Sequence, residues 1–316
     1  MTGHFLMPKR VYCYNCFRFL LFLCYNRGSN NKRWTSNLSQ DISQGRGETS
    51  ISPINPSNVS FIRPVKKKVI ALLLAYNAEK TLEKFCKTIP RSLVDEIIVF
   101  DDASSDQTVD VAKRLRLRVY RNKCNLGYGG NLKRALSICL EEGADIIVDI
   151  HPDGEYGTNV LPLAISKMKD GADLVLGNRF RSTKGTLQSG MFIWKYVVIK
   201  FLNYLCAVVL KTSGIDFHTG FRVYSRRLLK TANYIDNNSG FLFSFEIIVQ
   251  CIYHHLRLEH VPVETHYSGS KRGASLKFCV IYVLQTLGIL AHIVLNKFGV
   301  QTNRISRLIV GYPESL

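Results

Sequence analysis

The first 40 residues of the chain contain no aspartate or glutamate, and the first acidic residue is Asp41. Residues 1–68 hold 11 lysines and arginines against 2 acids, whereas residues 69–316 hold 31 against 22. Half of the net charge of +18 therefore lies on a basic terminal segment. Because no aromatic–basic platform or recognition motif accompanies this charge, we expect no nucleic-acid partner.

The sequence also lacks a cysteine framework. Its 9 cysteines are odd in number and scattered, which excludes a small disulfide-held secreted scaffold and favours reduced thiols in the cytoplasm. Cys13 and Cys16 have the spacing of half a zinc site, but no second pair follows at ligand spacing. With 46% hydrophobic and 21% charged residues, the composition is globular and excludes wholesale disorder, a collagen and a polytopic transporter.

The composition changes sharply at the three lysines of residues 66–68. Residues 26–60 are rich in Asn, Ser, Gly and Thr and have no sustained period, which predicts a disordered linker. The apolar run at 17–25 is too short to span a bilayer, and it is either a targeting segment or an extension without a role. We predict a disordered basic extension over 1–67, a folded domain over 68–277, and an apolar helix and tail over 278–316.

After this boundary, short apolar runs alternate with amphipathic stretches. Strands are predicted at 69–75, 96–100, 118–120, 145–150 and 173–176, and helices at 79–89, 105–115, 131–142 and 160–169. This alternation predicts an α/β fold with a mostly parallel central sheet flanked by helices. Ligands of such sheets bind beyond the carboxyl ends of the strands, so functional residues are expected there.

Polar or glycine-rich segments follow all five predicted strands. They read A-Y-N-A-E at 75–79, D-D-A-S-S-D at 101–106, N-L-G-Y-G-G-N at 125–131, H-P-D-G-E-Y at 151–156 and G-N-R-F at 177–180. Helix capping or turn formation explains any one of them, but five at one edge indicate a ligand site. The glycines at 127–130 do not form a dinucleotide fingerprint, because they follow the third strand and Leu132 replaces the last glycine. They predict a tight turn, or a turn beneath a substrate.

Together these motifs resemble the family 2 glycosyltransferases, which have the GT-A fold. The resemblance rests on Y-N at 76–77, D-D-x-S-x-D-x-T at 101–108, N-x-G-x-G-G at 125–130, Asp153, and G-N-R at 177–179. It covers residues 68–277 and is strongest with dolichyl-phosphate mannose synthases and other polyprenyl-phosphate glycosyltransferases. It implies a GT-A domain that transfers a hexose from a GDP- or UDP-sugar with inversion of the anomeric carbon.

The resemblance also implies which residues hold the sugar nucleotide. The loops after the first two strands would bind its base and ribose, although Ala78 replaces the acid that usually follows Y-N and Glu79 comes next. The expected nucleotide-sugar-binding residues are Ala75, Tyr76, Asn77, Glu79, Asp101, Asp102, Gly130 and Arg179.

A divalent cation, Mn²⁺ or Mg²⁺, is implied at the end of the fourth strand. The family's D-x-D motif falls on residues 151–153, with His151 in place of the first aspartate. Asp153 and Glu155 are the expected oxygen ligands, and His151 either ligates Mn²⁺, which tolerates imidazole, or only shapes the turn. Asp149 lies about 13 Å from Asp153 along an extended strand, too far to share the ion unless the chain folds back.

The expected catalytic residues are Asp153, Asp216 and Arg222, the last two in a D-x-x-[ST]-G-F-R stretch that matches the family. Arg222 would bind the acceptor or the diphosphate. If the acceptor is polyprenyl or dolichyl phosphate, its nucleophile is already anionic and no strong base is needed. If the acceptor is a hydroxyl, a carboxylate must take the proton, and Asp216 is the candidate.

Two apolar stretches, at 191–210 and 278–295, predict helices that contact a membrane surface. The first carries Lys195 and Lys200, as interfacial helices do. The second is long enough to span a bilayer, or is a terminal helix packed on the core. The expected location is cytoplasmic, on the cytosolic face of a membrane. Two alternatives remain: transfer to a saccharide or protein hydroxyl in surface-glycan synthesis, and a catalytically dead sugar-nucleotide-binding protein.

Overall fold

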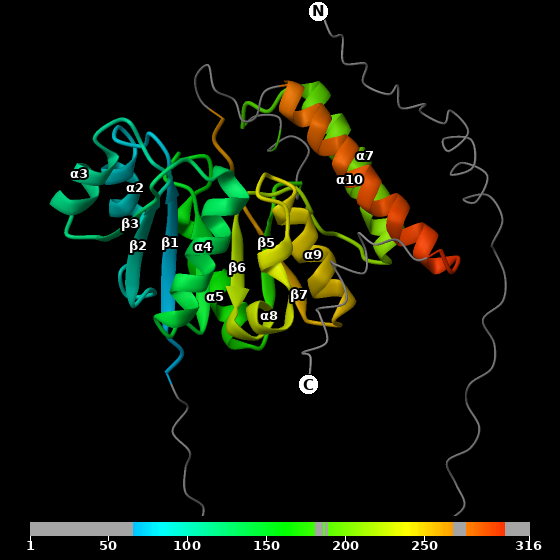
Figure 1. Cartoon of the computed structure of the whole chain (residues 1–316), viewed down its shortest axis with the longest axis horizontal. Coiled ribbons are helices and arrows are strands. Elements are labelled where there is room, and N and C mark those ends of the chain that lie inside the picture. The colour runs from blue at the N-terminus through cyan, green and yellow to red at the C-terminus, as the bar shows by residue number, and fades with distance from the viewer. Residues whose placement is uncertain (1–65, 181–185, 187–188, 268–275, 301–316) are drawn as a thin grey trace, which may run out of the picture. The chain divides into compact units, whose positions relative to one another are not determined.

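The structure of the protein is a computed structural model that describes residues 66–180, 186, 189–267 and 276–300 (Figure 1). Nearly all of the predicted extension over 1–67 lies outside these residues. The α/β prediction is confirmed by a 7-stranded sheet of order β3-β2-β1-β4-β6-β5-β7. All paired strands run parallel except β6, which is antiparallel to both β4 and β5.

The five predicted strands are present, with ends that differ from the prediction by at most two residues. Their bounds are β1 Val69–Ala75, β2 Glu96–Asp101, β3 Arg118–Arg121, β4 Ile146–Ile150 and β5 Leu174–Asn178. Two further strands, β6 Arg222–Ser225 and β7 Leu258–Pro262, were not predicted. Both are short and carry charged or polar residues, so neither gives the apolar run that marked the other strands.

Helices cover both faces of the sheet and bury two hydrophobic cores. Their bounds are α2 Leu82–Thr88, α3 Thr108–Arg114, α4 Gly127–Glu141, α5 Leu161–Lys169, α7 Ile193–Leu210, α8 Arg226–Thr231, α9 Phe243–Tyr253 and α10 Leu276–Lys297. Successive β1 side chains point to opposite faces: Leu72 packs in the core with α4, α7, α8, α9 and α10, and Leu73 in the core with α2, α3 and α5.

Helix α4 begins four residues earlier than predicted, so the glycine-rich stretch forms its first turn and not a loop. A Cβ at Gly129 would lie 2.5 Å from the carbonyl oxygen of Asn238 and 2.6 Å from that of Gly240. Glycine is therefore required at this position by the close approach of the segment that precedes α9. The Gly130 amide donates to the Ser239 carbonyl of this segment at 3.0 Å, which holds the segment against the start of α4.

The two predicted apolar helices are present as α7 and α10, which lie side by side (Figure 1). Their carboxyl ends meet where the Lys297 ammonium donates to the Val209 carbonyl at 2.7 Å. Both helices are long and apolar enough to cross a membrane, and only 17% of the most apolar stretch of each is buried. Each helix packs one set of side chains on the core and leaves another set of large apolar side chains exposed.

Candidate active site

The loops after β1 and β2 are bonded to each other, as expected for two sides of one site. The Asn77 amide donates to the Ser104 hydroxyl at 2.9 Å, and its side-chain oxygen accepts from the Ser105 amide at 2.9 Å. The Glu79 carboxylate accepts from the Gln107 amide at 3.0 Å. Tyr76 is 57% exposed beside these contacts, so its ring is available for stacking.

Two adjacent aspartates at the end of β2 have different roles. Both carboxylate oxygens of Asp102 accept hydrogen bonds. Oδ1 accepts from the Asn122 side chain at 2.7 Å and from the backbone amide of Leu126 at 2.8 Å, and Oδ2 accepts from the backbone amide of Gly127 at 3.0 Å. Asp102 therefore caps α4. Asp101 is also buried, but its Oδ1 has no hydrogen-bond partner among the described residues. Of the two carboxylates, only Asp101 keeps an acceptor atom without a partner in the described chain.

Arg121 was missed in the sequence analysis. It ends β3 at the same edge, where its Nε lies 3.4 Å from Asp101 Oδ2 and its Nη2 donates to the Ser104 carbonyl at 2.9 Å. Its position at the end of the third predicted strand could have indicated a role at this edge, because β3 pairs in parallel with β2. Two of the predicted nucleotide-binding residues use a backbone group in a hydrogen bond within the protein. The Ala75 carbonyl accepts from the Asp102 amide, and the Gly130 amide donates to the Ser239 carbonyl.

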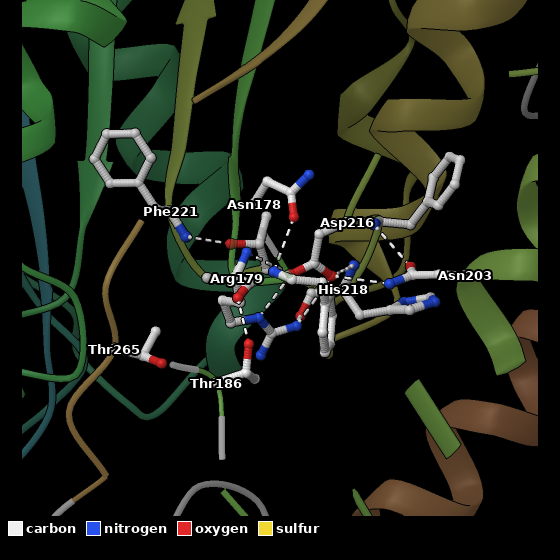
Figure 2. A network of polar contacts seen from close by, with 12 residues as sticks. Asn178, Arg179, Thr186, Asn203, Asp216, His218, Phe221 and Thr265 are labelled. Atoms are coloured by element: carbon white, nitrogen blue, oxygen red, sulfur yellow. Dashed lines mark hydrogen bonds and ion pairs between the residues drawn. The ribbon is translucent and has the colours of Figure 1, made fainter. Parts of the chain in front are cut away.

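Arg179 and Asp216 form a buried ion pair (Figure 2). The Arg179 Nε donates to Asp216 Oδ2 at 2.7 Å and its Nη2 to Oδ1 at 3.1 Å, a two-point contact that fixes both planes. Nη2 also donates to the His218 carbonyl and Nη1 to the Tyr267 hydroxyl. From α7, the Asn203 side chain donates to Asp216 Oδ1 at 3.3 Å. The pair is thus held from three parts of the chain.

This geometry makes Asp216 a poor proton acceptor. Burial alone would raise the pKa of its carboxyl group, but the charge and hydrogen bonds of Arg179 outweigh burial and hold the pKa below its ordinary value. A general base works best when its pKa is close to the operating pH. The arrangement therefore argues against Asp216 as the base that would activate a hydroxyl acceptor.

His218 connects this ion pair to helix α10. Its Nδ1 lies 2.8 Å from the Tyr282 hydroxyl, and its Nε2 lies 4.0 Å from the Cys206 sulfur. Burial lowers the pKa of the imidazole to about 3. The charge of Asp216 raises this pKa, but it is outweighed by burial and by the charges of Arg179 and Arg222, which lower it further. His218 is therefore neutral near pH 7.

The neutral imidazole predicts a loss of stability in mild acid. An unfolded histidine takes up a proton below about pH 6.5, whereas folded His218 does not, so unfolding becomes easier as the pH falls. This group should remove about 2 kcal/mol from the unfolding free energy between pH 7 and pH 5. Urea unfolding at both pH values should show that His218→Gln lacks this decrement, whereas His260→Gln, on an exposed histidine, retains it. An equal decrement in wild type and His218→Gln would contradict this assignment.

A second buried polar group lies where β4 pairs with β6. Arg222 is opposite Asp149 in the register, and its Nη1 donates to the Tyr128 hydroxyl at 3.1 Å. Asp149 accepts from the Tyr224 hydroxyl at 3.4 Å, and its other oxygen lies 4.0 Å from His151 Nε2. Within the described chain, neither Arg222 Nε nor Asp149 Oδ1 has a hydrogen-bond partner. The site therefore contains a buried cation with unused hydrogen-bonding capacity.

The predicted metal ligands do not form one preassembled group. In the described ranges, no three His, Cys, Asp or Glu side chains are gathered closely enough to hold a metal ion. His151 lies beside Asp149 and the Tyr128 ring, as expected if it only shapes the turn. Asp153 is exposed, and burial, followed by the charge of Asp153, raises the pKa of the Glu155 carboxyl. Two mutually repelling carboxylates fit a hard divalent cation whose other ligands are phosphate and water oxygens.

The sheet order and the loops at its carboxyl edge are those of a GT-A nucleotide-sugar transferase. Residues 71–232, slightly more than half of the chain, match the family described as glycosyl transferase family 2. The chain belongs to this family and is a hexosyltransferase by class, as the motifs at its strand ends predicted.

Two individual relatives share less than a quarter of their aligned residues with this chain. Polyprenol monophosphomannose synthase of Mycolicibacterium smegmatis is 24% identical over 229 residues, which cover 70% of this chain and 82% of that protein. UDP-N-acetylglucosamine–dolichyl-phosphate N-acetylglucosaminyltransferase of Methanococcus voltae is 23% identical over 220 residues, 64% of this chain and 87% of the relative.

Solved structures share the fold. Glucosyl-3-phosphoglycerate synthase from Mycobacterium tuberculosis, solved with UDP, superposes with a TM-score of 0.55 at 20% identity. The match covers 75% of this chain and 82% of that one. The same enzyme has also been crystallised with Mn²⁺, UDP and phosphoglyceric acid.

Proposed function

We propose that the protein is an inverting, metal-dependent glycosyltransferase that moves a hexose from a GDP- or UDP-sugar to a polyprenyl or dolichyl phosphate. The observation that carries this proposal is the engagement of Asp216 by Arg179 in a buried two-point ion pair. Because this carboxylate is a weak base, the site favours an acceptor that carries its own negative charge, as a phosphate does. Two relatives are named for transfer to dolichyl phosphate or synthesis of a polyprenol monophosphomannose, which supports the same acceptor class.

In this mechanism the loops after β1 and β2 hold the nucleotide. Tyr76 stacks on the base, and the Asp101 oxygen that has no partner among the described residues accepts a hydrogen bond from the base or ribose. Asp153 and Glu155 would hold the divalent cation, which supplies positive charge to the departing diphosphate. Arg179, whose charge Asp216 partly offsets, is fixed near Glu155 and needs no rearrangement as the leaving group becomes more negative.

Two basic residues lie where we expect the acceptor to bind. Lys195 of α7 lies near Glu155 and over the Tyr267 ring, with its ammonium 5.7 Å from the ring centre. Arg222 lies buried on β6, and its Nε has no hydrogen-bond partner in the described part of the chain. We assign both as cations that attract the acceptor phosphate and orient its oxygen toward the anomeric carbon. No proton needs to be removed from this oxygen, so the single displacement that inverts the anomeric carbon needs no general base.

We also propose that the protein acts at the cytosolic face of a membrane. A polyprenyl chain resides in a bilayer, and α7 and α10 offer an apolar surface of which little is buried. Large exposed side chains on this surface include Ile193, Val197, Phe201, Tyr204, Leu276, Phe278, Ile281 and Leu284. Such helices bind membranes chiefly by burying apolar area, so the attachment should persist at high salt.

The test uses purified full-length protein, vesicles that contain polyprenyl phosphate, and a panel of radiolabelled GDP- and UDP-sugars. We expect the protein to sediment with the vesicles, and one donor to transfer its label into the lipid extract. If no donor labels the lipid while a water-soluble saccharide becomes labelled, the alternative acceptor class is correct. If neither acceptor is labelled although a sugar nucleotide binds, the protein is catalytically dead.

A further inference from the structure

Three aromatic side chains form a continuous row from the reaction edge to helix α10. Tyr128, in the first turn of α4, lies with its ring centre 5.5 Å from that of His151. Phe241 stacks on Tyr128, with ring centres 5.3 Å apart and planes 17° apart. Phe278 of α10 meets Phe241 edge-on at 6.3 Å. We call Tyr128, Phe241 and Phe278 the aromatic row.

The inner end of the row is fixed by polar contacts. The Tyr128 hydroxyl accepts from Arg222 Nη1 at 3.1 Å and lies 3.1 Å from the Ser244 hydroxyl. These contacts orient the ring beside the buried cation. The inner end of the row therefore places a buried positive charge directly beside an aromatic ring.

Phe241 is exposed and yet held in place. Its ring is 51% exposed, which leaves apolar surface in water that folding alone does not require. The segment that carries it is anchored to α4: the Gly130 amide donates to the Ser239 carbonyl at 3.0 Å, and the Lys133 ammonium to the Asn237 carbonyl at 2.8 Å. An exposed ring on an anchored segment is a prepared contact surface.

The outer end of the row joins the apolar surface of α10. Phe278 is 56% exposed, and it is followed along the helix by the exposed side chains of Val280, Ile281 and Leu284. A charged inner end, a row of rings and an apolar outer surface match an amphiphile with an anionic head and a long hydrocarbon chain.

We propose that the aromatic row binds the hydrocarbon chain of the polyprenyl-phosphate acceptor. The phosphate lies at the reaction edge near Arg222, the isoprene units after the first cross Phe241, and the chain leaves over Phe278 toward the bilayer. This inference rests on the acceptor class proposed above, and it adds the residues that select a long chain over a short one. The Phe241 and Phe278 side chains offer no hydrogen-bonding group to the hydroxyls of a saccharide, which favours a hydrocarbon occupant.

The test varies the length of the acceptor. Phe241→Ala and Phe278→Ala are assayed with a long polyprenyl phosphate and with dimethylallyl phosphate, which has one isoprene unit. Each variant should raise the KM for the long acceptor on the order of tenfold, the value of one lost aromatic contact. The KM for the sugar nucleotide, the turnover with dimethylallyl phosphate and the thermal unfolding midpoint should not change.

Two controls separate this effect from folding and from sugar stacking. Tyr253→Ala removes an exposed ring on α9 outside the row and should leave the KM for the long acceptor unchanged. Phe241→Leu keeps an apolar side chain and should retain most of the affinity, whereas a sugar that needs a flat ring would lose it.

Three results would overturn the inference: an unchanged KM for the long acceptor in both alanine variants, an equal loss with dimethylallyl phosphate, or a loss confined to a water-soluble saccharide. If the wild-type protein glycosylates no prenyl phosphate of any length, the proposed acceptor class is wrong. That result is visible before any variant is made.

Discussion

Asp153→Ala is expected to lower turnover by about 10³-fold or more. Asp153 lies exposed after β4 with Glu155 beside it, and the two carboxylates fit a cation that neutralises the departing diphosphate. Loss of one such charge contact removes several kcal/mol of transition-state stabilisation, and each 1.36 kcal/mol is about tenfold in rate. The rate of sugar transfer from the nucleotide, measured at saturating donor, checks this value.

The same assay tests the metal directly. Excess EDTA should abolish transfer by the wild type, and added Mn²⁺ or Mg²⁺ should restore it. Asp170→Asn is the matched control, because Asp170 is an exposed aspartate at the end of α5, away from the carboxyl edge. Full activity in excess chelator would remove the metal from the mechanism.

Removal of one partner of the buried Arg179–Asp216 pair should give the largest loss of stability. Arg179→Met leaves an uncompensated carboxylate among buried groups, which costs about 3–5 kcal/mol of unfolding free energy. The double variant Arg179→Met/Asp216→Leu leaves no unpaired charge and should recover part of that loss. Urea unfolding of the three proteins measures both values.

An exposed pair supplies the control for this experiment. Lys87 and Glu83 are four residues apart on α2 at 2.7 Å, and Lys87→Met should cost less than about 1 kcal/mol. If the double variant regains stability but not turnover, the pair contributes to catalysis as well as to folding. A loss below about 1 kcal/mol for Arg179→Met would mean that the buried pair is not intact in solution.

The first five strands could be predicted because each is a short apolar run bounded by polar loops. Strands β6 and β7 could not be predicted in this way. Each contains a charged residue, Arg222 or Glu259, and each is too short to show an apolar run or an alternation of apolar and polar residues. The start of α4 was missed because glycines normally indicate a turn. Here Gly129 is needed for the close approach of residues 238–240, a contact between segments more than 100 residues apart.

The strand ends that carry the candidate site could be located in the sequence, but the state of each side chain could not. Asp101 and Asp102 are adjacent and identical in type, yet Asp102 caps α4 while Asp101 keeps an oxygen without a partner in the described chain. Asp216 was the candidate base for a hydroxyl acceptor until its two-point contact with Arg179 was seen. Such pairings join residues distant in sequence, and no local pattern encodes them.

One comparison tests most directly whether the acceptor brings its own negative charge. Vesicles that contain either polyprenyl phosphate or the uncharged polyprenol of the same length are incubated with the protein, the donor sugar nucleotide and Mn²⁺. Because Asp216 is held by Arg179 and is a weak base, sugar should be transferred to polyprenyl phosphate and not to polyprenol. Comparable transfer to polyprenol would show that a group in the site removes a proton from a hydroxyl, and would contradict the account.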